Sequence, residues 1–538
     1  MWQWEHDEGR SGRRPVEHGD APVQGPPGLV RILDTGATAR SLTRIVDFAR
    51  RRPGLVLAWV LGLHVLLWAV VPALVSHNLQ LDLVEDLALG KEWRLGYWKH
   101  PPLPWWVADA LYRLTNQIEV VYLLGPLAVV ACLYVVWLLA RRLVGPIEAL
   151  IAVLALEGIH FYNYSAVKFG HDQMQLPFWA LTGLFLYRGI VDQRARDWLL
   201  AGAALAFAFW SKYAAFALAG SIGLFLLVDP LARRAWRTPG PYLMAFAFAV
   251  VIAPNLWWLV DGGFLPFRYV DQRARVATHW YQLIVFPLQW TASQVFFLSP
   301  AIGLLAILHS RALRHPAPAP DSEAAFARRY VTMLAFGPFA VTTFVALVLG
   351  RLPVAMWGYP LWSFAPLAVL MWSRPLLNVA RLRLFAGAAL AILVTIPVIY
   401  AADLLFEPAV RDRPKATEFP GRLVADTVTR AFRDRTGLPL VYVGGDEFIA
   451  NNVAVYSSDR PHVVVQGQPA LSPWVDLDDL RRRGSVIIWG EGEIGMPPAR
   501  FAAAFPGAQL QPPLVLPRQT RFQVRPVQVH YAIVPPRL

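Results

Sequence analysis

The chain has 538 residues, of which 56% are hydrophobic and only 16% are charged, and its mean hydropathy is +0.40. Because a soluble domain usually carries about a quarter charged residues, this composition excludes an ordinary soluble protein. The net charge of +13 does not indicate nucleic-acid binding, since basic residues collect on the cytoplasmic loops of membrane proteins. Several apolar runs have the length, about 20 residues, at which a helix crosses the bilayer core. The sequence therefore predicts an integral membrane protein.

Residues 1–45 precede the first apolar run and are polar, charged and rich in Pro and Gly. They contain no apolar core next to a cleavage site, so they do not have the pattern of a signal peptide. The composition predicts a disordered cytoplasmic tail. The single cysteine, Cys132, lies inside an apolar run and rules out an intrachain disulfide framework.

Residues 46–403 are predicted to form the membrane region, with about eleven transmembrane helices. The predicted spans are residues 54–75, 118–140, 146–164, 174–191, 197–210, 213–229, 241–260, 283–308, 331–350, 354–373 and 384–403.

Arginine clusters set the predicted orientation, because Lys and Arg accumulate on cytoplasmic loops. In an eleven-span arrangement every cluster falls on the same side of the membrane, which we assign to the cytoplasm. The clusters are Arg50–Arg52, Arg141–Arg142, Arg194 with Arg196, Arg233–Arg237, Arg311 to Arg329, and Arg374 to Arg383. The loops 76–117, 165–173, 211–212, 261–282 and 351–353 then face outward, as does the chain after residue 404.

Residues 404–538 differ in composition from the membrane region, with more Pro, more charge and shorter apolar runs. Strands are predicted at 440–443, 462–465, 486–489 and 522–534, and a helix at 421–435. These elements predict a small extracytoplasmic, periplasmic α/β domain. Within it, Gly444-Gly445-Asp446-Glu447-Phe448 spells the signature of diguanylate cyclases. We interpret it as a coincidental strand, turn and helix cap at Asp446, because too few residues precede it for that domain and the compartment lacks GTP.

The first outward loop carries three carboxylates, Asp82, Glu85 and Asp86, followed by Gly96-Tyr97-Trp98-Lys99-His100-Pro101-Pro102. On a helix the three acids share one face, where mutual repulsion raises their pKa values. Spacing alone favours a solvated interfacial surface for the acids, and the His-Pro-Pro step alone is an extended turn.

The pattern nevertheless resembles the aspartate-containing first loop of GT-C glycosyltransferases. It is most similar to the bacterial dolichyl-phosphate-mannose-protein mannosyltransferase-like and aminoarabinose-transferase-like group, glycosyltransferase family 39 and its relatives. The spacing of eighteen residues between Asp82 and His100 matches the family pattern. The Glu that often follows the family Asp is Leu83 here, so another acid, such as Glu85, has to serve that role or the role is absent.

Further segments in family order extend the resemblance over roughly residues 54–375. They are His171-Asp172 before the fourth span, Ser211-Lys212-Tyr213 between the fifth and sixth, Pro254-Asn255 with Phe267 to Arg273, and Gln294 ahead of Ser299-Pro300. Taken singly, Lys212 also suits a snorkelling lysine, His171 an interfacial hydrogen bond, and Arg273 a headgroup contact. The orientation, derived without the motif, places six residues on the extracytoplasmic side: Asp82, His100, His171, Asp172, Lys212 and Arg273.

The resemblance implies an inverting glycosyltransferase that moves a sugar from a polyprenyl-phosphate donor to a lipid, glycan or protein acceptor at the periplasmic side of the inner membrane. We expect Asp82 to be the catalytic base. Lys212 is the first candidate to stabilise the departing phosphate, followed by Lys99, His100 and Arg273. Further substrate-binding candidates are Glu85, Asp86, Tyr97, His171, Asp172 and Tyr213.

No cofactor is required by the pattern, and a divalent metal bound by Asp172 and His171 is left open. The expected partners are membrane lipids, the lipid-linked donor and the acceptor, and no nucleic acid. The alternatives are a lipid-linked sugar flippase or another polytopic transporter, and a non-catalytic assembly subunit. A transporter would move its substrate without making a product.

Overall fold

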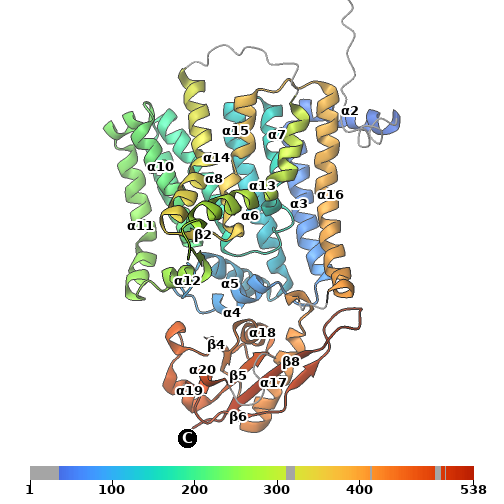
Figure 1. Ribbon diagram of the computed structural model, residues 1–538, viewed down its shortest axis with the longest axis vertical. Helices are drawn as coiled ribbons and strands as arrows, with labels where there is room; N and C mark the ends of the chain where they lie inside the picture. The colour runs from blue at the N-terminus through green and yellow to red at the C-terminus, as the bar shows by residue number, and fades with distance from the viewer. Residues whose placement is uncertain (1–35, 310–321, 412–414, 491–497, 503, 538) are drawn as a thin grey trace, which may run out of the picture.

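The computed structural model describes residues 36–309, 322–411, 415–490, 498–502 and 504–537. Its helices form an upright bundle, and a smaller region that contains a β-sheet lies beneath one end of the bundle in Figure 1. The first described helix, α2 (Gly36–Arg51), lies at the opposite end of the bundle from the sheet (Figure 1).

Among the described residues, six helices are long and apolar enough to cross a membrane. They are α3 (Pro53–Val75), η1 with α6 (Glu119–Leu143), α11 (Gly240–Asp261), α13 (Gln282–Leu308), α14 (Ser322–Val348) and α16 (Val379–Val410). Shorter or more polar bundle helices are α7 (Pro146–Leu156), α8 (His171–Asp192), α9 (Ala195–Ser211), α10 (Phe216–Val228), η5 (Ala355–Trp362) and α15 (Ala365–Ser373). Each of the eleven predicted segments contains helix, whereas the number of membrane crossings remains a prediction.

Polar contacts between helix ends show which ends lie together, away from the sheet. Arg142 at the end of α6 pairs with Asp192 at the end of α8. Arg329 near the start of α14 donates to Asp229, just past α10, at 2.6 Å. Since α14 begins at the top of the bundle in Figure 1, the predicted arginine-rich side is the side opposite the sheet. Arg311 and Arg314 lie outside the described residues.

The predicted span at 146–164 is wrong in extent, because α7 ends at Leu156. Two contacts with other helices explain this early end. The Glu157 carboxylate accepts a hydrogen bond from, or donates one to, the buried imidazole of His64 on α3 at 2.9 Å. Gly158 packs so closely on α13 that a Cβ atom there would lie 2.7 Å from the Ala301 nitrogen. Residues 157–170 therefore run as turns and one short helix, η2 (His160–Tyr162), packed inside the protein.

The predicted disordered tail is also wrong at its end, since α2 spans Gly36–Arg51. Leu42 and Val46, one turn apart, are buried, while basic side chains occupy other positions of the helix. This apolar stripe gives α2 a surface to bury, which a disordered segment lacks. Residues 1–35 of the predicted tail lie outside the described residues.

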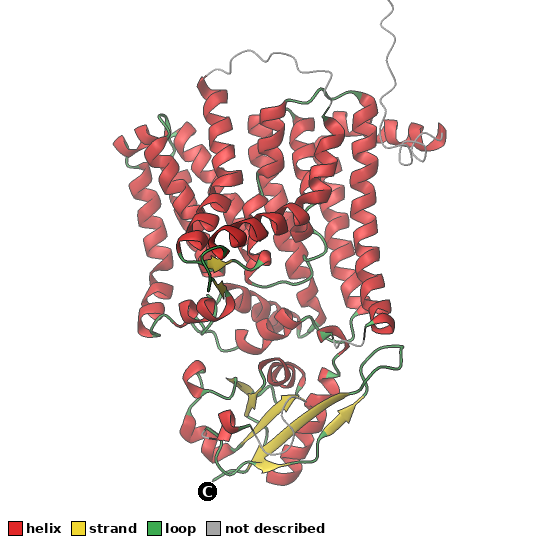
Figure 2. Cartoon of the chain, viewed as in Figure 1, coloured by secondary structure: helices red, strands yellow, loops and turns green. Residues whose placement is uncertain are grey.

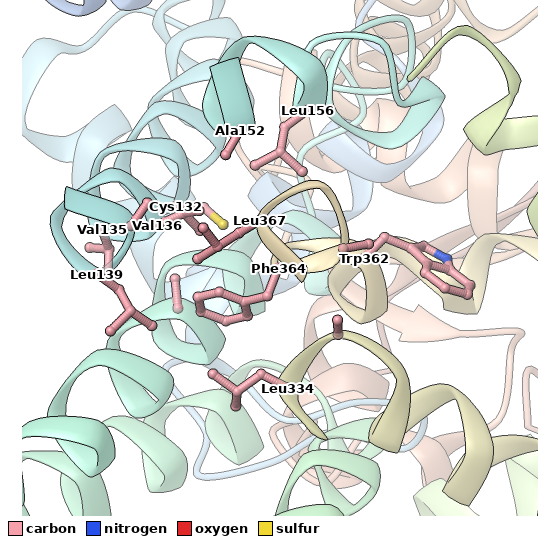
Figure 3. Close-up of a cluster of buried hydrophobic side chains, with 14 of the residues drawn as sticks. Cys132, Val135, Val136, Leu139, Ala152, Leu156, Leu334, Trp362, Phe364 and Leu367 are labelled. Atoms are coloured by element: carbon pink, nitrogen blue, oxygen red, sulfur yellow. The ribbon is translucent and has the colours of Figure 1, made fainter. Parts of the chain in front are cut away.

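The core of the bundle forms where α6, α7, α14 and the η5–α15 segment converge (Figure 3). Its side chains are almost all apolar, and Cys132 is buried among them as a free thiol. On α6, the core residues Val135 and Leu139 lie in the half of the helix that ends at Arg141 and Arg142 (Figure 3). The predicted site residues lie toward the other end of the bundle.

That other end is covered by short elements that lie across the ends of the long helices (Figure 1). They are α4 (Leu81–Gly90), α5 (Leu103–Thr115), α12 (Leu265–Arg273) and the two-stranded pair of β1 (Arg275–Val276) and β2 (Arg351–Leu352). The pairing of β1 with β2 ties the predicted outward loops 261–282 and 351–353 together.

The C-terminal α/β region contains a six-stranded sheet in the order β4-β3-β5-β8-β6, with β7 also paired to β8. Strands β3, β4 and β5 are parallel, and β8 runs antiparallel to its neighbours. Apart from β1 and β2, the strands among the described residues all lie here (Figure 2). The strands are β3 (Tyr442–Gly445), β4 (His462–Val465), β5 (Ser485–Gly490), β6 (Gln509–Leu510), β7 (Leu514–Leu516) and β8 (Val527–Val534), and the helices are η6 (Ala416–Glu418), α17 (Gly421–Thr436), α18 (Glu447–Tyr456), η7 (Pro469–Leu471), α19 (Leu477–Arg483) and α20 (Ala499–Ala502).

Two of the predicted elements in this region are shifted. Strand β8 starts at Val527 rather than 522, directly after Pro526, whose nitrogen cannot donate to a ladder. Strand β3 includes Gly444 and Gly445 instead of ending before them. Asp446 occupies the N-cap position of α18 as expected, but its carboxylate accepts from the Gly490 backbone N–H at 2.8 Å rather than from the helix.

Candidate active site

Helix α4 organises the site because it is sandwiched between the bundle and the C-terminal region. Its residues from Leu83 to Gly90 are all buried. Leu83 and Leu87 belong to the same hydrophobic cluster as Ile449 and Val453 of α18. On the opposite flank Gly90 allows close packing on α5, since a Cβ there would lie 2.2 Å from the Trp105 carbonyl oxygen. Burial on several sides fixes where the carboxylates of α4 point.

Asp82 lies in the first turn of α4 and is the exposed carboxylate of this helix. Protein nevertheless packs around it closely enough for burial to raise the pKa of its carboxyl group, an effect opposed by the charges of Lys168 and Lys99. Within the described residues, Asp82 makes no hydrogen bond and no ion pair. A carboxylate that is accessible, surrounded by protein and not engaged by a side chain is available to a substrate.

Lysines from three separate loops surround Asp82. Lys168 exerts the largest single charge effect on its pKa, and Lys99 and Lys212 act in the same direction. Lys99 and Lys212 are predicted site residues, whereas Lys168 was missed. The sequence signal for Lys168 was its place in the predicted outward loop 165–173. In the structure this loop approaches Asp82, since a Cβ atom added to Gly170 would lie 3.7 Å from the Asp82 Cβ. In the part of the chain described, the Lys168 ammonium has no ion-pair partner.

Lys212 follows α9 and pairs with Asp172 in the first turn of α8, at 2.7 Å between Nζ and Oδ1. Asp172 also accepts from the Gln175 amide at 3.3 Å. Lys212 is 8% exposed, so it is a nearly buried cation held at a defined position. The two predicted residues thus form one unit.

Lys99 is held by two carboxylates. Its Nζ atom lies 2.7 Å from Glu85 Oε2 and 2.7 Å from Glu447 Oε1. Glu447 is the first residue of α18 and belongs to the segment that we interpreted as a coincidental motif. The C-terminal region therefore reaches the first loop directly, a contact that could not be predicted from the sequence.

Asp86 and Glu85 are more enclosed than Asp82. Burial raises the pKa of Asp86 well above its usual value, and the nearby Asp82 and Glu85 raise it further. Burial also raises the pKa of Glu85, against the opposing charge of Lys99. Asp86 is 1% exposed, which leaves it without the access that its predicted role in binding substrate requires.

The two predicted histidines, His100 and His171, lie in contact beside this cluster with their rings tilted by 35°. The ring centroids of His100 and His171 lie 4.1 Å apart. His171 Nε2 is 3.1 Å from the carbonyl oxygen of Pro101, so the His-Pro-Pro turn is fastened to the start of α8. Burial, the neighbouring His171 and the lysines hold the pKa of His100 well below its usual range, which favours the neutral ring.

Three other predicted residues lie farther from Asp82. Tyr97 is buried, and its hydroxyl donates to the Leu89 carbonyl at 3.0 Å, so it supports the packing of α4. The Tyr213 hydroxyl donates to Asn255 Oδ1 at 3.0 Å. Arg273 is exposed at the end of α12. It lines a separate cavity of about 280 Å³ together with Arg275, Gln289, Trp290, Ser293 and residues 352–355.

A divalent metal has no evident protein cage in the described part of the chain. No group of three or more His, Cys, Asp or Glu side chains there is arranged to hold a metal ion. The acids near Asp82 are instead interleaved with lysines, which compete with a cation for the same oxygens.

Comparison with known proteins agrees with this architecture. The family profile described as dolichyl-phosphate-mannose-protein mannosyltransferase matches residues 99–258. A lipid A galacturonosyltransferase, RgtD, from Rhizobium johnstonii is 34% identical over 196 residues, which are 35% of this chain and 39% of the relative. The match thus spans about two fifths of that relative's length.

Among solved structures, ArnT from Cupriavidus metallidurans bound to undecaprenyl phosphate superposes with a TM-score of 0.57. The two chains are 14% identical, and the match covers 89% of this chain and 98% of ArnT. The fold is therefore similar to that of ArnT, and over residues 99–258 the sequence resembles the GT-C class of glycosyltransferases. Within that class, the predicted resemblance to the aminoarabinose-transferase-like group, with ArnT among its members, is confirmed.

Proposed function

We propose that the protein transfers a sugar from a polyprenyl-phosphate donor to an acceptor at the extracytoplasmic face of the membrane. The observation that carries the proposal is Asp82, an accessible carboxylate on a buried helix that lies among Lys168, Lys99 and Lys212. The ArnT structure with undecaprenyl phosphate supports a lipid phosphate as the carrier.

In the proposed reaction Asp82 takes the proton of the acceptor hydroxyl as its oxygen bonds to the anomeric carbon. The bond from that carbon to the phosphate oxygen breaks, and its electron pair leaves with the polyprenyl phosphate. Attack from the side opposite the phosphate inverts the anomeric centre. The product carries one more negative charge on phosphate than the donor did, and the nearby lysines stabilise it.

Ionisation of the base and stabilisation of the departing phosphate depend on different groups. A base must be ionised, and the positive charges of Lys168, Lys99 and Lys212 oppose the effect of burial on Asp82. A departing phosphate needs a fixed positive charge, and Lys212 provides one that Asp172 holds at 2.7 Å. Arg273 and Arg275, which line the separate cavity, are further candidates to contact a charged headgroup.

We further propose eleven membrane crossings, a bacterial inner-membrane location and a periplasmic site. The support is the separation of charge: the arginine-rich helix ends meet at one end of the bundle, and Asp82, Lys99 and Lys212 lie at the other. The C-terminal α/β region is then a periplasmic domain. The relative named as a lipid A galacturonosyltransferase makes an envelope lipid the first acceptor to test and a galacturonosyl donor the first sugar.

A flippase or transporter is the second candidate, and one buried pair favours it. His64 in the middle of α3 and Glu157 at the end of α7 lie at membrane depth, where ionisable residues often mark transport paths. Both side chains are sealed, with exposed fractions of 0% and 2%. A transport path needs access to water, which this pair lacks.

The test is to incubate purified protein with radiolabelled undecaprenyl-phosphate sugars and a panel of lipid, glycan and peptide acceptors. The proposal expects a covalent product and free undecaprenyl phosphate in equal amounts. Donor that crosses the bilayer of proteoliposomes unchanged, with no product, would favour the transporter instead.

A further inference from the structure

The Glu447 carboxylate enters the candidate site from the C-terminal region. It pairs with Lys99, whose ammonium also binds Glu85, each at 2.7 Å. The three side chains are nearly buried, with exposed fractions of 11% for Lys99, 10% for Glu85 and 21% for Glu447. Lys99 is therefore one cation shared by two acids that are 362 residues apart in the sequence.

The position of Glu447 is fixed by the structure behind it. Gly445 ends β3 with a φ of +120°, and a Cβ there would lie 1.9 Å from the Ile488 carbonyl oxygen, so only glycine permits this entry into α18. At the other end of α18, the Tyr456 hydroxyl accepts from the Leu79 backbone N–H at 3.0 Å. Asn78 donates to Asn452 at 3.0 Å. Helix α18 is thus seated on the entrance to α4, and Glu447 points at Lys99.

The charge of the trio bears on the proposed chemistry. With both acids ionised, Lys99, Glu85 and Glu447 sum to one negative charge, which repels an anion. Burial and the adjacent Glu447 each raise the pKa of Glu85, as expected for two acids that share one cation. A phosphate oxygen can bind Lys99 only in competition with these carboxylates.

We propose that Glu447 is a positioning residue of the donor site. Its carboxylate holds the Lys99 ammonium until the lipid phosphate takes the place of that carboxylate on Lys99. This inference rests on the proposed function for the identity of the anion. The C-terminal region then sets the affinity for the phosphate and favours release of the product, whose extra negative charge would otherwise bind Lys99 more tightly than the donor does.

A second ion pair across the same interface supplies a matched control. Arg422 of α17 pairs with Glu119 of η1 at 2.6 Å, and both side chains are more than half exposed. Glu119→Gln removes one negative charge and one interface contact without touching Lys99. Any effect of a weakened interface should therefore appear in both variants, while an effect on Lys99 should appear only in Glu447→Gln.

The experiment measures the dissociation constant of radiolabelled undecaprenyl phosphate for the full-length protein in detergent, with uncharged undecaprenol as a second probe. Glu447→Gln should bind undecaprenyl phosphate about three- to tenfold more tightly and bind undecaprenol as the wild type does. Glu447→Asp, whose shorter side chain holds Lys99 less closely, should fall between the two. In a Lys99→Met background, Glu447→Gln should have no effect.

The inference would be overturned if the Glu447→Gln protein unfolds at the wild-type temperature but binds undecaprenyl phosphate no more tightly than wild type does. An equal gain in the Lys99→Met background would also overturn it, since Glu447 would then act without Lys99. Because binding needs no turnover, a protein that shows the predicted binding pattern but transfers no sugar would refute the proposed function and leave the role of Glu447 standing.

Discussion

Asp82 and Asp86 lie one turn apart on α4 in opposite environments: Asp82 is exposed to solvent, and Asp86 is 1% exposed with one carboxylate oxygen that has no hydrogen-bond partner. Burial raises the pKa of both, and raises that of Asp86 well above its usual value. One helix therefore presents an accessible carboxylate to the site and holds a second carboxyl group in the interior, where burial favours the protonated form.

Asp86→Asn should consequently leave transfer activity within about threefold of wild type, because Asp86 is buried and the neutral amide has the same shape as the protonated acid that burial favours. Its effect on stability should depend on pH. Because the folded-state pKa of Asp86 is raised, the stability that its protonated form contributes is present below the unfolded-state pKa and is lost as the pH rises through the folded-state pKa. In thermal unfolding of purified protein, the Tm of Asp86→Asn should rise relative to that of wild type as the pH increases. A pH-independent difference would contradict the assignment.

Lys168→Met should shift the acid limb of the pH profile of kcat/KM to higher pH. Lys168 is the largest charge that opposes the raised pKa of Asp82, so its loss makes the base harder to ionise. Activity should fall more at pH 6 than at pH 8. Lys168→Arg keeps the charge and should keep the wild-type profile; a uniform loss at every pH in Lys168→Met would point to a structural role.

Lys212→Met should lower kcat by about a hundredfold or more, because the negative charge on the departing phosphate develops only as the bond breaks. The KM for the donor should change less than kcat. Lys212→Arg should retain part of the activity, since it keeps the charge but changes the fit to Asp172. Steady-state kinetics with a labelled donor separate the two parameters, and a rise in KM alone would assign Lys212 to ground-state binding.

His64→Ala should destabilise the protein by at least about 1–3 kcal/mol, because it leaves the Glu157 carboxyl group buried without its partner. The transfer rate per folded molecule should stay near that of wild type, since the pair is sealed and lies apart from Asp82. Thermal unfolding and specific activity test the two statements. Loss of a transport activity in the folded variant would favour the transporter.

Much of the architecture follows from local sequence. Apolar length predicted the presence of helix in every proposed span, and two members of the arginine clusters, Arg142 and Arg329, lie near helix ends and pair with acids of neighbouring elements. The loops that carry Asp82, Asp172 and Lys212, which were predicted to face outward, do converge, although their separation in sequence is large. Strands at 462–465 and 486–489 were predicted from β-branched runs and lie in the sheet.

Features that depend on long-range packing could not be predicted. Hydropathy continues past Leu156, but α7 stops there because Glu157 meets His64 from another helix. Glu447 belongs to a region with no sequence link to Lys99, and only the seating of α18 on α4 joins them. The sequence does not distinguish Lys168 from other loop lysines, and only the fold brings it close enough to act on Asp82.

The most direct test of the account is the Asp82→Asn variant, assayed for transfer from labelled undecaprenyl-phosphate sugar to the acceptor found with wild-type protein. The amide keeps the shape of the side chain and cannot take a proton, so kcat/KM should fall by about a hundredfold or more. Expression, thermal unfolding and binding of undecaprenyl phosphate should stay close to wild type. Wild-type transfer activity in Asp82→Asn would contradict the account.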